Sequence, residues 1–174
     1  MTINRHGSAT LEFPSDHEMQ TTRKFDVSAE LLFDVLTTPE HVRVWFTGGN
    51  NELEVCEIDL RVGGGYRYVG VFDDGVRCSF HGTFLEIERP VRTVETWVFD
   101  GRPQDEAVET TTLREDDGVT TMTTLLVFRD RSGLDSMFAH AGDQRDDPRI
   151  AIDGMQASFD KLEDHLARVA REVK

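Results

Sequence analysis

The sequence predicts an α+β fold in which one antiparallel sheet is covered by a long helix at the carboxyl end. Between residues 53 and 128, several segments have apolar residues at every second position, separated by turn-like stretches, as in strands with one buried face. From about Pro148 to Val173 they recur at spacings of three and four, as in a helix with one apolar face. A curved sheet closed by one helix leaves a hollow, which side chains, a ligand or both can fill.

The first residues predict a single strand that is interrupted. Ala9–Phe13 and Met19–Phe25 alternate like strands, and Pro14–Asp16 breaks the pattern between them. We therefore interpret residues 1–20 as an amino-terminal extension or a broken first strand. Residues 21–173 are expected to form one domain, which suits a chain of 174 residues.

Two short helices are expected next. Ser28 can cap the first, because a serine side chain accepts a hydrogen bond from the first turn. Pro39 is typical of the first position of a helix, and this second helix is expected to end near Trp45 and Phe46. The apolar stripe of the first helix consists of Leu31, Leu32, Val35 and Leu36.

Six further strands are expected after the two short helices. Asp117-Gly118 is typical of a tight hairpin turn between two of them. We interpret Arg129–Asp147, which has a short helical stretch at Leu134–His140, as a lid-like connection or a plain linker. The expected strands are Leu53–Ile58, Gly65–Phe72, Val76–Glu88, Arg92–Phe99, Ala107–Arg114 and Val119–Phe128.

The terminal helix is expected to lie on the sheet through its apolar stripe. The alternative is that the stripe forms a coiled-coil seam in a homodimer, but about three heptads without a repeat elsewhere disfavour this reading. The stripe consists of Ile152, Met155, Phe159, Leu162, Leu166 and Val169.

The composition excludes several classes of partner. The chain has 33 acidic and 19 basic residues and a net charge of −14, which repels nucleic acids and anionic membranes. No run approaches the ~18 apolar residues of a membrane span. Cys56 and Cys78 form no CxxC pair, and the first residues contain no apolar segment of a signal peptide, so we expect a cytoplasmic protein.

Three groups of residues resemble a known family. They are Ser28–Val35 followed by Pro39-Glu40 and Trp45-Phe46, Asp59–Arg67 with the sequence DLRVGGGYR, and Phe80–Ile87 followed by Thr96-Trp97. In this order and spacing, the chain from about Thr21 to Val169 resembles the Hsp90 ATPase activator homologue-like proteins of the START-like (SRPBCC) superfamily. The resemblance implies a helix-grip (START-like, Bet v 1-like) fold, in which a seven-stranded antiparallel sheet and a long carboxyl-terminal helix surround a cavity. It implies no common set of catalytic residues.

The alternation of the strands indicates which side chains face the hollow. Tyr66 and Tyr68 share one face of a strand, and Trp97 and Phe99 share one face of another. Such side chains either fill an aromatic core or line a pocket for a small apolar or aromatic molecule. The expected ligand-binding residues are Trp45, Phe46, Tyr66, Tyr68, Phe80, Glu95, Trp97, Phe99, Met122, Met155 and Phe159.

Two residues are candidates for chemistry. Glu95 alternates in register with Trp97, and burial would raise the pKa of its carboxyl group, suiting it to general acid or base catalysis or to binding a cationic or hydroxylated ligand. The alternative is that Glu95 faces solvent or pairs with Arg67 or Arg77. His81 is the other catalytic candidate, although it can equally be a hydrogen-bonded residue of the sheet.

No cofactor is expected. The six histidines are scattered without the spacing of metal ligands, so no metal site is predicted. Three functions remain open. The protein binds a small hydrophobic molecule in its cavity, it is a cavity enzyme of the cyclase or dehydratase type, or, as the family name suggests, it is a partner of a chaperone.

Overall fold

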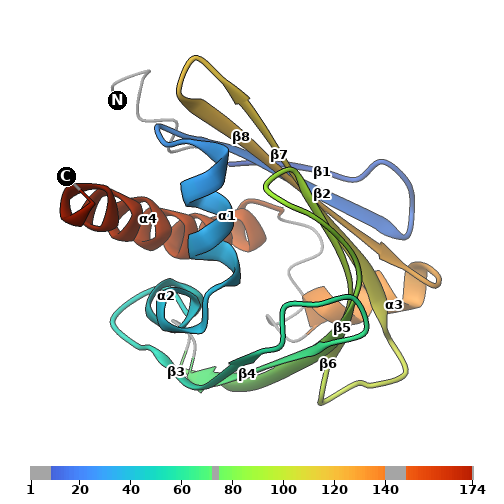
Figure 1. Cartoon of the computed structure of the whole chain (residues 1–174). Helices are drawn as coiled ribbons and strands as arrows, with labels where there is room; N and C mark the ends of the chain where they lie inside the picture. Colours follow the sequence, from blue (N-terminus) through green and yellow to red (C-terminus); the bar gives the residue numbers. More distant parts are fainter. Residues whose placement is uncertain (1–8, 72–74, 140–147, 174) are drawn as a thin grey trace.

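The computed structural model describes residues 9–71, 75–139 and 148–173, except the side chains of residues 138–139 and 148–154. One antiparallel sheet has the strand order β1-β2-β8-β7-β6-β5-β4-β3. The sheet curves around helix α4, α1 lies across α4, and α2 lies beside β3 and β4 (Figure 1). The strands are β1 (Thr10–Glu12), β2 (Glu18–Phe25), β3 (Leu53–Ile58), β4 (Gly65–Val71), β5 (Arg77–Glu88), β6 (Arg92–Phe99), β7 (Ala107–Asp116) and β8 (Val119–Phe128). The helices are α1 (Ala29–Thr37), α2 (Pro39–Trp45), α3 (Arg131–Ala139) and α4 (Pro148–Glu172).

The predicted α+β fold and the antiparallel sheet are confirmed, but the sheet has eight strands where seven were expected. The difference lies at the amino-terminal end. β1 pairs with β2 in an antiparallel hairpin, so that Thr10 lies opposite Thr22 and Glu12 lies opposite Gln20. The prediction of one broken strand was therefore wrong, because the chain reverses between the two segments and adds an edge strand.

The two short helices form where the sequence predicts them. The side chain of Ser28 accepts a hydrogen bond of 3.2 Å from the backbone N–H of Leu31 and so caps α1. Pro39 is the first residue of α2, where its missing N–H leaves no intrahelical bond unmade. Trp45 is the last residue of α2, and this end of the helix carries aromatic side chains towards the sheet.

Helix α4 packs on the sheet through the predicted stripe. Leu162 and Leu166 are fully buried in a core that they share with Phe25 and residues of α1. The rings of Phe25 and Phe159 meet edge to face with centroids 6.4 Å apart. This stripe is consequently occupied within the chain, and the alternative of a coiled-coil seam on it was wrong. Ile152, which the prediction included in the stripe, lies outside the described side chains.

Arg23 is an unexpected member of this core. Its side chain is fully buried on β2, where its guanidinium group forms ion pairs of 3.0 Å with Asp160 and 2.9 Å with Glu163 on α4. It also lies over the rings of Phe25 and Phe159, at 5.2 and 5.8 Å from their centroids. Arg23 thus joins the first long strand to the terminal helix.

Helix α3 covers one end of the sheet. Leu134 is buried against Met19, Ala107 and Phe128. The helix begins three residues before the predicted stretch, which ran from Leu134 to His140. Residues 140–147 of the expected lid-like connection lie outside the described residues, so the lid stays a prediction.

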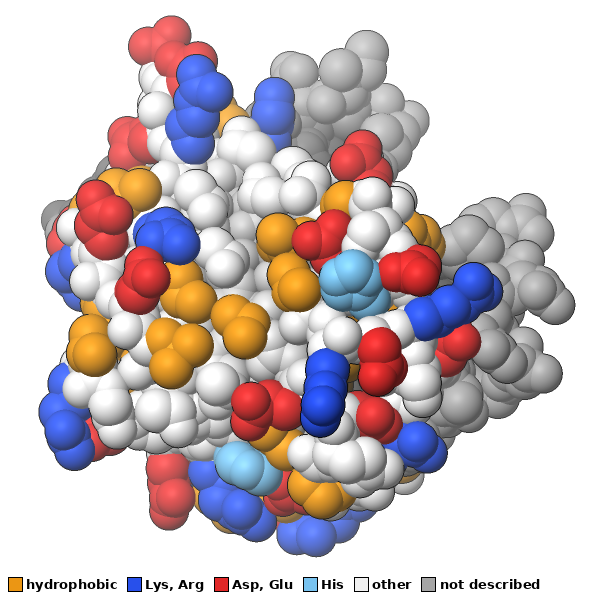
Figure 2. Space-filling model, turned by 90° about the vertical axis from the view of Figure 1, so that its right-hand side faces the viewer, with side chains coloured by type: hydrophobic (Ala, Val, Ile, Leu, Met, Phe, Trp, Pro, Cys, Tyr) orange, Lys and Arg blue, Asp and Glu red, His pale blue; other side chains and the backbone are white. Residues whose placement is uncertain are grey.

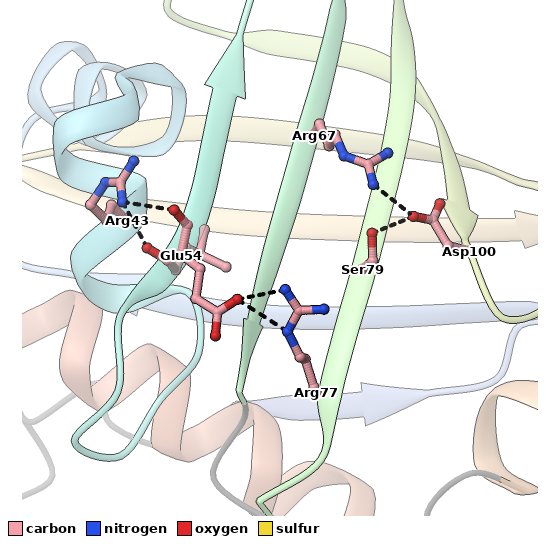
Figure 3. A network of polar contacts seen from close by, with 7 residues as sticks. Arg43, Glu54, Arg67, Arg77, Ser79 and Asp100 are labelled. Carbon is pink, nitrogen blue, oxygen red and sulfur yellow. Dashed lines mark hydrogen bonds and ion pairs between the residues drawn. The ribbon is translucent and has the colours of Figure 1, made fainter.

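Strand β3 forms one edge of the sheet and is held by two arginines (Figure 3). Arg43 of α2 donates hydrogen bonds to the backbone carbonyls of Leu53 (2.9 Å) and Glu54 (3.3 Å). On the strand's side-chain surface, Arg77 of β5 pairs with the Glu54 carboxylate at 2.7 Å. Both contacts tie the edge strand to its neighbours.

The surface carries charges of both signs. Figure 2 shows acidic, basic and apolar side chains interspersed on one side of the molecule. Among the described helices, none is both long and apolar enough to cross a lipid bilayer.

Candidate functional site

The register of the sheet places two carboxylates side by side on its inner face, the face that packs towards α4. Across this face, Met19 lies opposite Leu126, Leu126 opposite Glu109, Glu109 opposite Glu95, and Glu95 opposite Phe84. Met19, Leu126 and Phe84 are buried, which shows that this row faces the core. We call these five residues the carboxylate row. Directly paired side chains in an antiparallel sheet have Cβ atoms about 5 Å apart, so the two carboxylates are neighbours.

A connected group of rings lies next to the carboxylate row. Phe46, the residue directly after α2, contacts Tyr68 at a centroid distance of 4.8 Å and Phe80 at 6.3 Å. Phe80 in turn contacts Trp97 at 5.3 Å and Phe99 at 5.5 Å. Tyr66 completes the group through Tyr68, at 4.9 Å. We call Phe46, Tyr66, Tyr68, Phe80, Trp97 and Phe99 the aromatic set.

A glycine makes room within the aromatic set. Gly82 lies opposite Tyr66 in the sheet, and a Cβ atom there would stand 1.8 Å from the carbonyl oxygen of Thr96 and 2.6 Å from the Tyr66 ring. Without that atom, the Tyr66 ring can lie over β5, and its hydroxyl donates a hydrogen bond of 2.8 Å to the Thr96 carbonyl.

The two carboxyl groups resist ionisation. Desolvation, followed by repulsion from Glu109, raises the pKa of Glu95 well above its usual value. Desolvation raises the pKa of Glu109 to about 7. No basic side chain in the described part of the chain offsets these effects. The pair is therefore at least partly protonated near neutral pH and can both donate and accept hydrogen bonds.

The alternative partners expected for Glu95 lie elsewhere. Arg67 pairs with Asp100 at 3.6 Å, and Arg77 pairs with Glu54 at 2.7 Å. The interpretation of Glu95 as one half of a surface ion pair with either arginine was therefore wrong. Its actual neighbour is a second carboxylate.

Tyr68 lies close enough to the two carboxylates for their charge to affect its hydroxyl group. Desolvation, followed by the charge of Glu95, raises the pKa of the Tyr68 hydroxyl well above its usual value. The pKa of Tyr66 is also raised, first by desolvation and then by Glu109 and Glu95. Both hydroxyls consequently stay protonated, and that of Tyr68 can donate a hydrogen bond to a carboxylate or to a ligand.

A row of threonines lies on the other side of the carboxylate row. Thr93 lies opposite Thr111, Thr111 opposite Thr124, and Thr124 opposite Thr21. We call these four residues the threonine row. The inner face therefore changes from aromatic rings through carboxyl groups to hydroxyl groups along the strand direction.

Three predicted ligand-binding residues belong to the hydrophobic core and not to the aromatic set. Trp45 is buried, and its indole N–H donates a hydrogen bond of 3.3 Å to the carbonyl of Val35. Met122 is buried in the core that contains Leu162, and Phe159 packs against that same core. Met155 is intermediate, since it packs partly buried against the Met19 and Leu126 cluster, as Trp97 does.

His81 lies on the outer face of the sheet, away from the other candidates. Its side chain alternates with Phe80 on β5 and is 46% exposed. It is hydrogen-bonded to Asp100, which also accepts a bond from Ser79 and pairs with Arg67 (Figure 3). The histidine is thus a partner of a surface carboxylate, which matches the second reading of this residue.

Sequence reasoning missed Glu109 and the threonine row. A signal for Glu109 was present, because it alternates with Ala107 and Leu113, which are both buried on the inner face. Its pairing with Glu95 depends on the register between β6 and β7, which the residue pattern within a single strand does not predict.

The family model described as "Activator of Hsp90 ATPase homolog 1-like protein" matches residues 26–167. The chain belongs to this family. The match spans α1 to most of α4, so the chain carries the family fold over nearly its whole length, and the resemblance seen in the sequence is confirmed.

Solved structures show the same fold at low sequence identity. A protein of Rhodobacter sphaeroides is 20% identical, with a TM-score of 0.77 over 92% of this chain and 99% of its own. Protein Ms6760 of Mycobacterium smegmatis is 17% identical, with a TM-score of 0.74 over 89% of this chain and 94% of its own. CalU16 of Micromonospora echinospora is 19% identical, with a TM-score of 0.56 over 86% of this chain and 65% of its own. Among curated proteins, none matches the chain.

Proposed function

We propose that this protein binds a small apolar or aromatic molecule between the inner face of its sheet and helix α4. The observation that carries the proposal is the aromatic set, in which rings from α2, β4, β5 and β6 form one connected wall. Flat apolar walls with a few polar groups are typical of small-molecule sites.

The state of the inner-face side chains supports an internal cavity. Tyr68, Phe80, Trp97, Glu95 and Glu109 are only half-buried, so solvent reaches them. Desolvation by the surrounding protein nevertheless raises the pKa values of Tyr68 and of both glutamates. Partial exposure together with desolvation is expected of groups on the wall of a ligand cavity, and this supports the proposed site.

The two tryptophans of the chain allow a matched test. N-phenyl-1-naphthylamine is a neutral apolar probe whose fluorescence rises in an apolar site. Trp97→Leu removes a ring of the aromatic set and should weaken its binding about tenfold. Trp45→Phe changes the core tryptophan, whose ring meets the set at Phe46 with centroids 5.6 Å apart; because an aromatic ring remains there, the affinity should fall much less than in Trp97→Leu.

The comparison of the two variants decides where the probe binds. If Trp97→Leu binds the probe with the same affinity as the unmodified protein, the probe does not bind at the aromatic set. Failure of the unmodified protein to bind the probe, or any other apolar molecule of similar size, would contradict the proposed function itself.

A second candidate function is a cavity enzyme of the cyclase or dehydratase type. The observation that favours it is the Glu95 and Glu109 pair, since one protonated and one ionised carboxyl group can serve as general acid and general base. Glu95→Gln should then abolish turnover of a substrate while leaving its binding intact. If the same variant only weakens binding, the pair orients a ligand and does no chemistry.

A third function, the partner of a chaperone, rests on the family name. It stays a prediction, as do the cytoplasmic location and a homodimer formed through another surface. Co-purification of the full-length chain with Hsp90 tests the first of these.

A further inference from the structure

Within the described residues, the carboxylate pair has no basic partner, although both side chains are partly buried on the inner face of the sheet. Buried acidic side chains are normally matched by a basic partner, because an unpaired buried charge is unfavourable. The basic residue that is buried on the same face, Arg23, is already paired with Asp160 and Glu163 on α4. In the described chain, neither Glu95 nor Glu109 receives a stabilising contact from a basic group.

The groups around the pair are those that bind an organic cation. Trp97 follows Glu95 by two residues on the same face of β6, and the rings of the aromatic set continue from it. A protonated amine is attracted both to carboxylates and to the faces of aromatic rings. The Tyr68 hydroxyl, which the charge of Glu95 reaches, adds a hydrogen-bonding group at the same place.

We propose that the inner face selects a small aromatic molecule that bears a protonated amine. Its ring lies against Trp97 and Phe80, and its ammonium group lies between Glu95 and Glu109. This inference rests on the proposed ligand-binding function and narrows its ligand from any apolar molecule to an aromatic amine. The ammonium group supplies a positive charge, which no described residue provides to the two carboxylates.

The threonine row fits the polar end of such a ligand. Its hydroxyls lie directly beyond the carboxylates on the side away from the rings. A purely apolar ligand long enough to pass the carboxylates would cover these hydroxyls without bonding to them, which is unfavourable. A ligand whose apolar part ends at the carboxylates does not cover these hydroxyls.

A series of three probes with the same ring tests the inference by titration calorimetry on the full-length protein. The probes are 2-(1-naphthyl)ethylamine, 2-(1-naphthyl)ethanol and 1-naphthylacetate, which differ in the charge at the end of the side chain. The amine should bind about tenfold or more tightly than the alcohol, and the acetate should bind most weakly. In the Glu95→Gln/Glu109→Gln double variant, the preference for the amine should disappear while the affinity for the alcohol is retained or increased.

The other outcomes separate this inference from the proposed function. Equal binding of amine and alcohol to the unmodified protein would overturn the amine specificity and leave ligand binding intact, and this comparison needs no variant to fold. Tightest binding of the acetate would overturn it too. A preference for the amine that survives in the double variant would show that the pair is not responsible. If none of the three probes binds, and N-phenyl-1-naphthylamine does not bind either, both proposals fail.

Discussion

Glu109 links the stability of this protein to pH. Its pKa is raised from 4.5 to about 7 by desolvation, so the folded state holds a proton that the unfolded chain has already lost in this range. The folded state therefore binds more protons than the unfolded state between these two values, and stability falls as pH rises through the window. Glu95, whose pKa is raised as well, acts in the same direction.

The first prediction concerns Glu109→Gln. This change removes the ionisable group while keeping its shape, and should raise the free energy of unfolding at about pH 8 by on the order of 2 kcal/mol. At about pH 5, where Glu109 is protonated in the folded state, the effect should be small. Urea denaturation at the two pH values measures it, with the exposed Glu106→Gln as the control. A gain of the same size at both pH values would contradict this explanation.

Individual residues show where sequence reasoning succeeds and where it stops. Glu95 was placed correctly beside Trp97, because both lie in one strand and alternation alone relates them. Glu109 was missed, because its relation to Glu95 depends on the pairing of two strands. Arg23 lies on the buried face of β2, as strand alternation predicts. From the sequence alone its charge argued against burial, because the two carboxylates of α4 that pair with it could not be identified.

At the scale of elements, the described side chains of α4 (residues 155–172) differ in how deeply they are buried. Leu162 and Leu166 are fully buried, whereas Phe159, one turn earlier, is only partly buried. The packing energy of a side chain follows the surface that it removes from water and the cavity that its loss leaves. The contribution of each stripe residue therefore differs along the helix.

The second prediction compares two alanine substitutions on α4. Leu162→Ala should lower the free energy of unfolding by about 3 to 4 kcal/mol, since it leaves a closed cavity in the core. Phe159→Ala should lower it by about 2 kcal/mol, because part of the ring already faces solvent and the space can be refilled by water. Chemical denaturation of both variants measures the difference. A larger loss for Phe159→Ala would place the main packing contact nearer the start of the helix.

Helices α2 and α4 are joined by a pair of histidines. The Nδ1 atom of His165 accepts a hydrogen bond of 3.1 Å from Arg168, so its proton lies on Nε2, which donates to Nδ1 of His41 at 2.9 Å. Desolvation, followed by the charges of His41 and Arg168, lowers the pKa of His165 from 6.5. The folded state thus disfavours protonation of the His165 side chain. The stability that the neutral imidazole provides is complete above pH 6.5 and is lost as the pH falls below 6.5.

The third prediction concerns His165→Gln. The unmodified protein should lose stability as pH falls from about 6.5, and the variant should lose less over the same interval, because it has no buried imidazole to protonate. Denaturation midpoints measured across this range give the two slopes. Equal slopes in the two proteins would contradict this explanation.

For the whole molecule, periodicity predicted most of the architecture. The bounds of β3, β6 and β8 match the predicted ones, and those of β4 and β5 differ by one residue at one end, because each of these strands has one buried face. The hairpin of β1 and β2 was not predicted. Pro14 and its neighbours signal a break, but whether the chain then continues or reverses depends on which strand edge is free, and that is a property of the assembled sheet.

The fourth prediction tests how much of the chain the fold requires. β1 contributes only three paired positions, at the edge of the sheet, and β2 remains paired with β8 without it. A chain that lacks residues 1–15 should fold and bind N-phenyl-1-naphthylamine, with a loss of about 1 to 3 kcal/mol in unfolding free energy. Near-ultraviolet circular dichroism and the probe titration measure the two properties. Loss of the near-ultraviolet signal would mean that the domain begins before residue 16.

The contact of Arg43 with β3 has a consequence for how copies of this protein behave in a crowded solution. An open sheet has two outermost strands, and their free carbonyl and N–H groups can recruit a strand from another molecule and start aggregation. The guanidinium group of Arg43 occupies the carbonyls of Leu53 and Glu54 at the start of one such strand and places a positive charge beside it. A strand from another molecule would have to displace this group before it could pair with β3. The arginine therefore disfavours edge-to-edge aggregation at β3.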